Sequence, residues 1–228
     1  MKRTIVVAGY GPGISAAVAR KFGAEGYAVA LVARRAGPLE EGVKALQAAG
    51  IKAQAFPADL SQGEGLFGLI AQIRGALGPI GVLHWNAYSG AAGDLLAASL
   101  EELRSVYEVS VVGLIAAVQA SLQDLKAERG AVLVTGGGFG LDDPKAAAAA
   151  TRFGAMGLAI GKASQRKAVA LLHHRLAGEG VYVGEVVVRG IVKGTAFDQG
   201  QATLDADTIA ARFWELAQKR SEPSVHVL

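Results

Sequence analysis

The sequence predicts an α/β protein built on a doubly wound parallel sheet, with about seven strands and helices on both faces. Three observations predict this Rossmann-type class. Short runs rich in Val, Ile and Ala alternate with longer amphipathic segments along the chain, a pattern typical of βαβ units. Hydrophobic residues make up 51% of the 228 residues and charged residues 19%, a balance that suits buried parallel strands. A glycine-rich segment also joins the first apolar run to the first amphipathic segment.

Each predicted strand is a short apolar run that ends in glycine, proline or polar residues. In chain order the strands are expected at 4–8, 28–33, 53–57, 82–85, 131–135, 181–188 and 225–228. Amphipathic helices are expected between them at 14–25, 38–49, 65–77, 100–128, 145–178 and 205–219. No linker interrupts this alternation, and the length suits one domain. We therefore expect residues 1–228 to form a single unit.

Composition excludes several classes of partner. The formal charge is +3, but Lys and Arg are scattered rather than clustered, which argues against nucleic acid. There is no cysteine, and the four histidines lack zinc-site spacing, so no metal site is expected. The apolar start is too short for a secretion signal, and about 18 consecutive apolar residues occur nowhere. We expect a soluble cytoplasmic protein that does not bind membranes.

The glycine-rich turn after the first predicted strand is the first candidate site. Its glycines are Gly9, Gly11 and Gly13, and Ile14 opens the next helix, while Ser15 replaces a third fingerprint glycine. Such glycines let backbone amides approach a pyrophosphate, which also meets the positive end of the helix dipole. We therefore expect Gly9, Gly11, Gly13 and Ile14 to bind a dinucleotide. A tight turn that binds nothing is the alternative.

The end of the second predicted strand indicates which dinucleotide is bound. A protein that prefers NAD places an acidic residue there to hold the ribose hydroxyls, but this chain has Arg34 and Arg35. Guanidinium groups pair with a 2'-phosphate, whereas a carboxylate would repel it. The sequence therefore predicts NADP(H). Arg34 is the expected contact, and Arg35 is either a second contact or a solvated residue.

From residue 1 to about residue 195 the order of these features resembles the short-chain dehydrogenase/reductase family. Asp59 and Leu60 follow the third predicted strand, Asn86 and Ala87 follow the fourth, and Lys162 lies in a predicted helix. The resemblance implies that the first pair lies near the adenine and that the second pair lines the cofactor site. It also implies that the Lys162 ammonium binds the nicotinamide ribose, although an ordinary exposed helix lysine is the alternative.

A later loop completes the resemblance. Residues 190–195 are similar to the family loop that holds the nicotinamide carboxamide, which implies cofactor contacts by Ile191 and Thr195. The region 194–219 stands where the family builds a substrate lid. Phe213 and Trp214 in its helix are expected either to cover an apolar substrate or to pack on the sheet.

The catalytic residues of the family are mostly missing. The family uses Ser to hold a carbonyl, Tyr to exchange a proton, Lys to lower the tyrosine pKa and Asn to hold a water relay. The tyrosine position is Leu158, the serine position is Gly136 or Gly137, and the asparagine position is Ser110. Of this set only Lys162 remains, so a reductase would need another proton donor.

Four residues are candidates for that donor. Tyr88 follows the fourth predicted strand, Tyr107 lies one helical turn before Ser110, and Asp142 and Asp143 follow the fifth strand. The carboxyl ends of these elements face the cofactor crevice. Tyrosines in such places are more often packing residues, and Asp142 and Asp143 with the following proline also suit the N-cap and start of a helix. We take Lys162, Ser110 and Tyr88 as the candidate catalytic residues.

Two functions compete on this basis. One is an oxidoreductase that transfers hydride between NADP(H) and a small carbonyl or an activated alkene with a non-standard proton donor. Retention of Lys162, and of glycines 136–138 as a roomy loop for substrate, favours it. The other is a catalytically inactive NADP(H)-binding sensor or partner subunit, favoured by the joint loss of three catalytic residues. We predict the oxidoreductase, acting on a small molecule. The alanine-rich stretch 146–150 indicates a homodimer or homotetramer, or simply close core packing.

Overall fold

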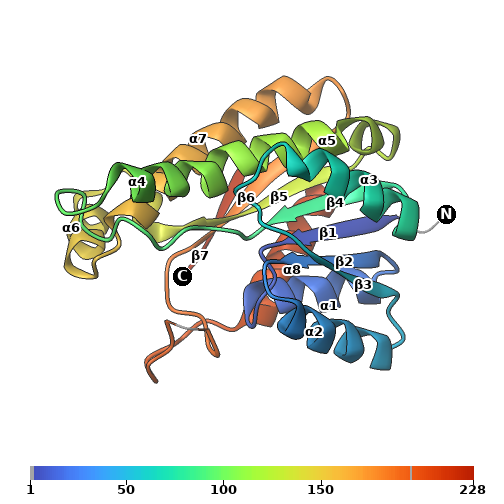
Figure 1. Cartoon of the computed structure of the whole chain (residues 1–228), viewed down its shortest axis with the longest axis horizontal. Helices are drawn as coiled ribbons and strands as arrows, with labels where there is room; N and C mark the ends of the chain where they lie inside the picture. Colours follow the sequence, from blue (N-terminus) through green and yellow to red (C-terminus); the bar gives the residue numbers. More distant parts are fainter. Residues whose placement is uncertain (1–2, 196) are drawn as a thin grey trace.

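A seven-stranded parallel sheet forms the centre of the molecule. The computed structural model describes residues 3–195 and 197–228, and the strand order is β3-β2-β1-β4-β5-β6-β7. Because all strands run in the same direction, their carboxyl ends share one edge, on the left in Figure 1. The strands are β1 Thr4–Ala8, β2 Ala28–Ala33, β3 Ala53–Pro57, β4 Ile80–Trp85, β5 Ala131–Gly137, β6 Tyr182–Val188 and β7 Ser224–Val227. The predicted fold class and all seven predicted strands are confirmed.

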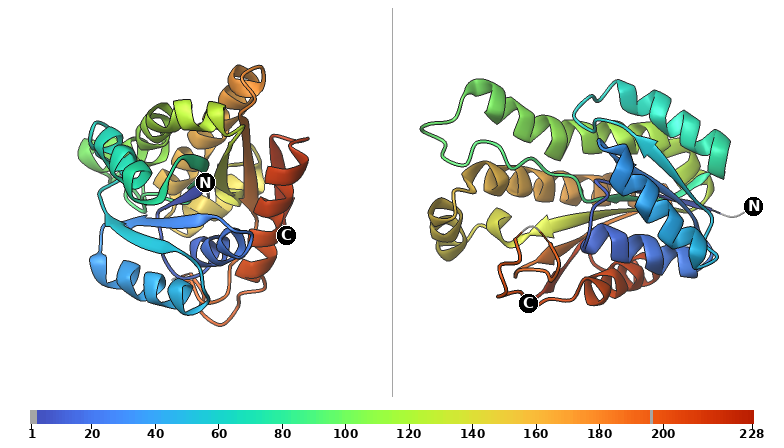
Figure 2. Two further views of the ribbon diagram at one scale, coloured as in Figure 1. Left: turned by 90° about the vertical axis from the view of Figure 1, so that its right-hand side faces the viewer. Right: turned by 60° about the horizontal axis from the view of Figure 1, so that its bottom comes forward.

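Helices cover both faces of the sheet. One layer contains α1, α2 and α8, and the other contains α3, α4, α5 and α7 (Figures 1 and 2). Their bounds are α1 Ile14–Ala24, α2 Ala36–Ala48, α3 Gly65–Leu77, α4 Leu100–Tyr107, α5 Gly113–Ala127, α6 Pro144–Arg152, α7 Met156–Ala177 and α8 Ala206–Lys219. Short π and 3-10 segments, η1 Glu108–Val112 and η2 Gly138–Gly140, lie between α4 and α5 and after β5.

Side chains alternate between the two cores along each strand. In β1, Val6 faces the core under α3, α5 and α7, whereas Val7 faces the core under α1 and α8. In β4, Trp85 joins the first core, and the His84 ring packs 4.8 Å from the ring of Phe213 in the second. Phe213 is fully buried. The structure therefore shows that it packs on the sheet and does not cover a substrate.

Two long predicted helices differ from the observed ones. The helix expected over 145–178 is two helices, α6 and α7, separated by Gly154 at a φ of 58°. That left-handed conformation ends a helix, and the chain restarts where the Gly157 amide donates to the Ala92 carbonyl at 2.8 Å. The helix expected over 100–128 is continuous but contains the π segment η1, which widens its middle turn.

One helical stretch is long and apolar enough to cross a membrane. It is Leu100–Ala127, with a mean hydropathy of 1.5 over its most apolar window, 44% of which is buried. Length and composition are weak grounds for a membrane span, because core helices of soluble proteins share them. Here α5 packs on the sheet through Leu114, Ala117 and Leu125, so core packing accounts for its apolar residues.

Candidate functional site

The glycine loop after β1 lies where the strand order reverses. The chain crosses from β3 at one edge back to β4 beside β1, and crevices at such switch points hold ligands in open α/β sheets. The Asn86 side-chain amide donates to the Gly9 carbonyl at 3.1 Å. A Cβ on Gly9, whose φ is 83°, would lie 2.5 Å from the Ala87 amide nitrogen. Asn86 and Ala87 therefore brace the loop, and only glycine fits at position 9.

Ser15 closes the same loop from inside the first turn of α1. Its hydroxyl accepts from the Gly11 amide at 2.9 Å and donates to the Gly11 carbonyl at 3.0 Å. The serine that replaces a fingerprint glycine thus stabilises the turn through hydrogen bonds to the Gly11 main chain. Next to it, the Thr195 methyl lies 2.7 Å from the position that a Cβ on Gly13 would take. The structure therefore brings Thr195 from the loop after β6 onto the start of α1.

The predicted adenine-side residues lie together beyond β2 and β3. Arg34 and Arg35 are exposed directly after β2, and Arg35 precedes the first residue of α2. The Asp59 carboxylate accepts from the Ser61 amide at 3.0 Å and from its hydroxyl at 2.8 Å. These bonds, with a smaller effect of the Arg34 charge, lower the pKa of Asp59. Leu60 is buried behind it.

Lys162 is a buried amine at the carboxyl edge of the sheet. The residue is 7% exposed, and its ammonium donates to the Thr135 carbonyl at 2.6 Å and to the Gln165 side-chain oxygen at 3.0 Å. Burial lowers the pKa of Lys162 to about 8, and the nearby Glu185 carboxylate partly offsets this shift. The alternative of an ordinary exposed helix lysine is therefore wrong.

Tyr88 is the predicted donor that lies beside this amine. The Lys162 nitrogen is 5.9 Å from the centre of the Tyr88 ring, which also lies 6.2 Å from the ring of Phe197. Partial burial raises the pKa of Tyr88, so the phenol keeps its proton at neutral pH. Three different segments thus meet at Tyr88, which lies beside both Lys162 and Phe197.

The other predicted donors are arranged differently. The Asp143 carboxylate caps α6 by accepting from the Lys145 amide at 2.8 Å, which is the alternative reading of that residue. Asp142 is exposed, and Tyr107 on α4 is about as exposed as Tyr88, which differs in lying against the Lys162 amine. Ile191 is also exposed, on the loop whose strand-like bridge joins Val192 to Leu204.

The glycines at the end of β5 do not form the roomy loop that was expected. A Cβ on Gly136 would lie 2.9 Å from a Glu185 carboxylate oxygen, and one on Gly137 would lie 3.5 Å from Cγ of Lys162. The expectation is wrong because Glu185 and Lys162, from other segments, pack beside these glycines, and the local sequence does not reveal those contacts. Gly136 and Gly137 make room for Glu185 and Lys162, and not for a bulky substrate.

Ser110 contributes its main chain to the site. It lies in η1 and is 2% exposed, and its carbonyl accepts from the Gln165 side-chain amide at 3.0 Å. Its hydroxyl lies 2.7 Å from where a Cβ on Gly161 would stand. Sequence reasoning overlooked Gln165, although a polar residue three positions after Lys162 in an apolar stretch shares its helix face.

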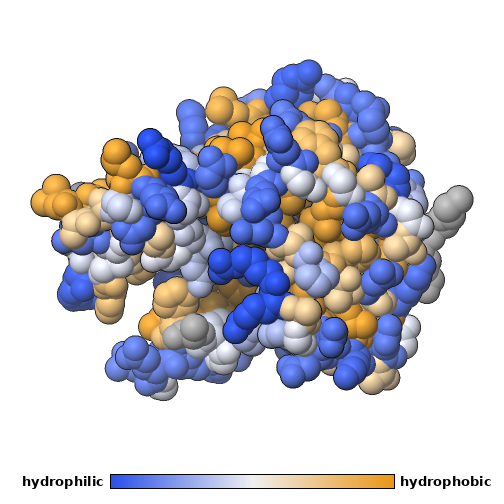
Figure 3. All heavy atoms as spheres, viewed as in Figure 1, coloured by the Kyte–Doolittle hydropathy of each residue, from blue (hydrophilic) through white to orange (hydrophobic). Residues whose placement is uncertain are grey.

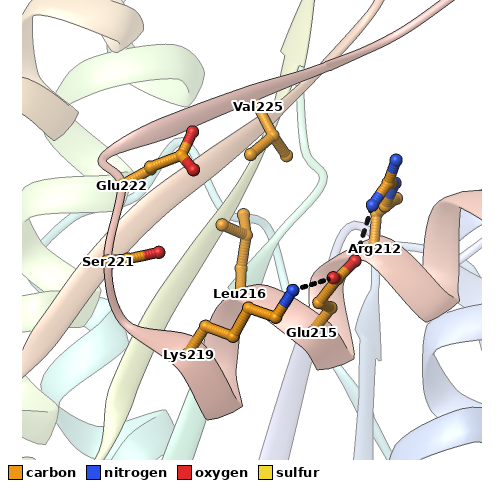
Figure 4. Close-up of a pocket in the computed structure, with 7 residues that line it drawn as sticks. All are labelled: Arg212, Glu215, Leu216, Lys219, Ser221, Glu222 and Val225. Atoms are coloured by element: carbon orange, nitrogen blue, oxygen red, sulfur yellow. Dashed lines mark hydrogen bonds and ion pairs between the residues drawn. The ribbon is translucent and has the colours of Figure 1, made fainter.

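The surface is hollowed on the side of the molecule where the strands end (Figures 1 and 3). Figure 3 shows a hollow between the part of the molecule formed by α4 and α6 and the segment that precedes α8. A different pocket lies between α8 and the start of β7, at the amino edge of the sheet (Figure 4). There the Glu215 carboxylate already pairs with both Arg212 and Lys219. Within 3–195 and 197–228, no three His, Asp or Glu side chains gather as metal ligands.

Comparison with known proteins assigns the family. A model described as short chain dehydrogenase matches residues 3–201. The chain belongs to the short-chain dehydrogenase family. It is 30% identical over 144 residues to 2,3-dihydro-2,3-dihydroxybenzoate dehydrogenase of Bacillus subtilis, covering 63% of this chain and 55% of that protein. It is 33% identical over 124 residues to 3beta-hydroxysteroid dehydrogenase 1 of Eggerthella lenta, covering 53% and 46%. The match thus spans about half the length of these curated relatives.

Solved structures share the whole fold. A short chain dehydrogenase from Burkholderia cenocepacia, in complex with NADP, superposes with a TM-score of 0.86 at 23% identity over 99% of this chain and 96% of that chain. A blue fluorescent protein from a metagenomic library, in complex with NADPH, gives 0.85 at 23% identity over the same shares. At this identity the likeness concerns the fold.

Proposed function

We propose that the protein is an NADP(H)-dependent oxidoreductase that transfers hydride between its cofactor and a small carbonyl or an activated alkene. One observation carries the proposal: the buried Lys162 ammonium and the protonated Tyr88 phenol lie side by side at the carboxyl edge of a family fold. Burying a cation costs free energy unless partner groups accept its hydrogen bonds. The cofactor ribose hydroxyls are the partner that membership of this family offers.

The residues around the glycine loop fit a dinucleotide. Gly9 and Gly13 have positive φ values, which the tight turn requires, and nothing lies within 4 Å of a Cβ on Gly11. We assign the pyrophosphate to Gly9, Gly11, Gly13 and Ile14 at the start of α1. The 2'-phosphate would meet Arg34 and Arg35.

The remaining cofactor contacts follow from the same edge of the sheet. Asp59 and Leu60 would border the adenine, and Asn86 and Ala87 the middle of the cofactor. Ile191 and Thr195 would lie at the nicotinamide end, where Lys162 would hold the ribose. NADPH supplies the hydride when it is bound.

The proton has a separate source in this account. During reduction of a carbonyl, the substrate oxygen gains a proton as its carbon gains hydride, which yields an alcohol. Tyr88 would donate that proton from its phenol, and the positive charge of Lys162 would stabilise the phenolate that remains. Leu158, at the usual tyrosine position, has no proton to give.

Three wider features belong to the same proposal. Residues 1–228 would act as one domain, with residues 194–204 as the part of the predicted lid that covers the substrate beside Tyr88 and Phe197. We also propose a homodimer or homotetramer located in the cytoplasm. Light scattering coupled to gel filtration would measure the mass, and a monomer would contradict the oligomer.

Titration of the purified protein with NADPH and NADH tests the cofactor assignment. Fluorescence of the bound nicotinamide would report both dissociation constants. We expect NADPH to bind more tightly, because only NADPH carries the phosphate that pairs with the arginines. Absence of binding to either nucleotide would contradict the proposal.

Replacing Arg34 with Asp is expected to reverse this preference. The variant loses a charge-assisted contact of about 1.5–3 kcal/mol, which corresponds to roughly a tenfold to hundredfold weaker binding of NADPH. NADH affinity should change little. Lys52→Asp is the matched control, since Lys52 is an exposed residue at the amino edge of the sheet with the same charge change. An unchanged ratio of the two dissociation constants in Arg34→Asp would overturn the assignment.

A further inference from the structure

Gln165 is an amide buried between the lysine and the main chain of another helix. It is 1% exposed and lies one turn after Lys162 on α7. Its oxygen accepts from the Lys162 ammonium and its nitrogen donates to the Ser110 carbonyl, each at 3.0 Å. Because an amide has one accepting and one donating end, it can satisfy both neighbours at once. The reverse orientation would place NH₂ against an ammonium and oxygen against a carbonyl.

The π segment makes this bridge possible. In η1 the helix is wider than an α-helix, and the Ser110 carbonyl turns toward α7. Gly161 allows the two helices to approach, because a Cβ there would lie 2.7 Å from the Ser110 hydroxyl and 2.9 Å from a Val106 methyl. The sequence thus supplies a small residue, a widened turn and an amide at one contact.

We propose that Gln165 is a positioning residue for Lys162: it fixes the direction of the ammonium and ties it to the main chain of η1. With the Thr135 carbonyl it occupies two of the three ammonium hydrogens. The third hydrogen is left for a ligand on the Tyr88 side of the site. The inference rests on the proposed use of Lys162 in the cofactor site.

Two titratable groups near Lys162 have hydrogen-bond or ion-pair partners of their own. Glu185 on β6 pairs with Arg166 at 2.8 Å and accepts from Ser224 at 2.9 Å. His84 on β4 bonds to the Thr135 hydroxyl at 3.1 Å, and burial, with a smaller effect of Lys162, lowers its pKa to about 3. His84 therefore stays neutral, and Tyr88 stays protonated. Gln165 and Thr135 are the groups that accept hydrogen bonds from the ammonium.

The titration of Lys162 in the cofactor-free protein tests this role. Carbon-13 at lysine Cε allows NMR to follow each amine, and Lys162→Met assigns the signal. In Gln165→Met we expect the Lys162 pKa to fall by about one unit or more, because a hydrogen bond to the charged form is lost. In Gln165→Glu we expect it to rise, because a carboxylate favours the ammonium. Opposite shifts would not arise from a merely structural role.

A matched control removes a similar amide elsewhere. The Gln47 side chain donates to the Ala53 carbonyl at 3.2 Å, so Gln47→Met should leave the Lys162 pKa unchanged. An unchanged Lys162 pKa in Gln165→Met would overturn the proposal. If Gln165→Met does not fold, an unchanged or lowered Lys162 pKa in Gln165→Glu would overturn it. Because the measurement needs no cofactor, a wild-type protein that fails to bind NADPH would contradict the proposed function while this test of Gln165 stands.

Discussion

Tyr88→Phe is expected to reduce turnover by about 10²–10⁴-fold, the usual cost of removing a general acid. The substitution deletes the phenol hydroxyl and keeps the ring that lies 5.9 Å from the Lys162 nitrogen and 6.2 Å from Phe197. Cofactor binding should therefore be preserved. Stopped-flow measurement of NADPH oxidation with a carbonyl substrate would show a lower maximal rate at an unchanged NADPH dissociation constant.

Tyr107→Phe is the matched control for this prediction. Tyr107 is exposed to a similar degree, 42% against 43% for Tyr88, and lies on α4. Its hydroxyl has no part in the proposed step, so its loss should leave the rate near that of the wild type. Equal rates for Tyr88→Phe and the wild type would remove Tyr88 as the donor, and a drop in Tyr107→Phe alone would move that role to Tyr107.

Lys162→Met is expected to have the second large effect. Methionine matches the lysine stem in length but cannot donate to the cofactor ribose. We expect binding of NADPH and NADH to weaken by roughly tenfold to hundredfold, since a hydrogen bond from a charged group contributes about 1.5–3 kcal/mol. Isothermal calorimetry would measure both constants. An equal affinity in variant and wild type would place Lys162 outside the cofactor site.

The same variant allows a test that needs no ligand. The pKa of Lys162 is about 8 in the folded protein against an ordinary value of 10.5, so between these values the unfolded chain binds more protons. The free energy of unfolding of the wild type should therefore gain a contribution as the pH rises from about 8 to 10.5. Lys162→Met should lack that contribution. Parallel stability curves for the two proteins would mean that the lysine is not buried as described.

Much of the fold was predictable because its signals are local. Runs such as residues 5–8 and Ala28–Ala33 are apolar over most of a strand, and parallel strands buried on both faces require such runs. The break between α6 and α7 was missed because a single glycine, Gly154, interrupts an otherwise helical pattern. The π segment in the long helix contacts α7 through the Ser110 carbonyl, and no local pattern reveals it.

The site residues that belong to sequence motifs were predictable, and those whose role depends on tertiary contacts were not. Gly9, Asn86 and Lys162 follow a family order, and the structure brings them to one edge of the sheet. Gln165 was missed because its role depends on the Ser110 carbonyl, 55 positions away. The room expected at Gly136 is filled by Glu185 from the neighbouring strand. Tertiary packing, and not sequence spacing, decides both features.

Transfer of deuterium tests the central claim most directly. The protein would be incubated with NADPH deuterated at C4 of the nicotinamide, in separate 4R and 4S forms, and with a panel of small aldehydes, ketones and enones. Mass spectrometry of the products would follow the label. We expect an alcohol or saturated product that carries one deuterium from one of the two forms. Tight binding of NADPH without labelled product across the panel would contradict an oxidoreductase and favour an inactive NADP(H)-binding sensor or partner subunit.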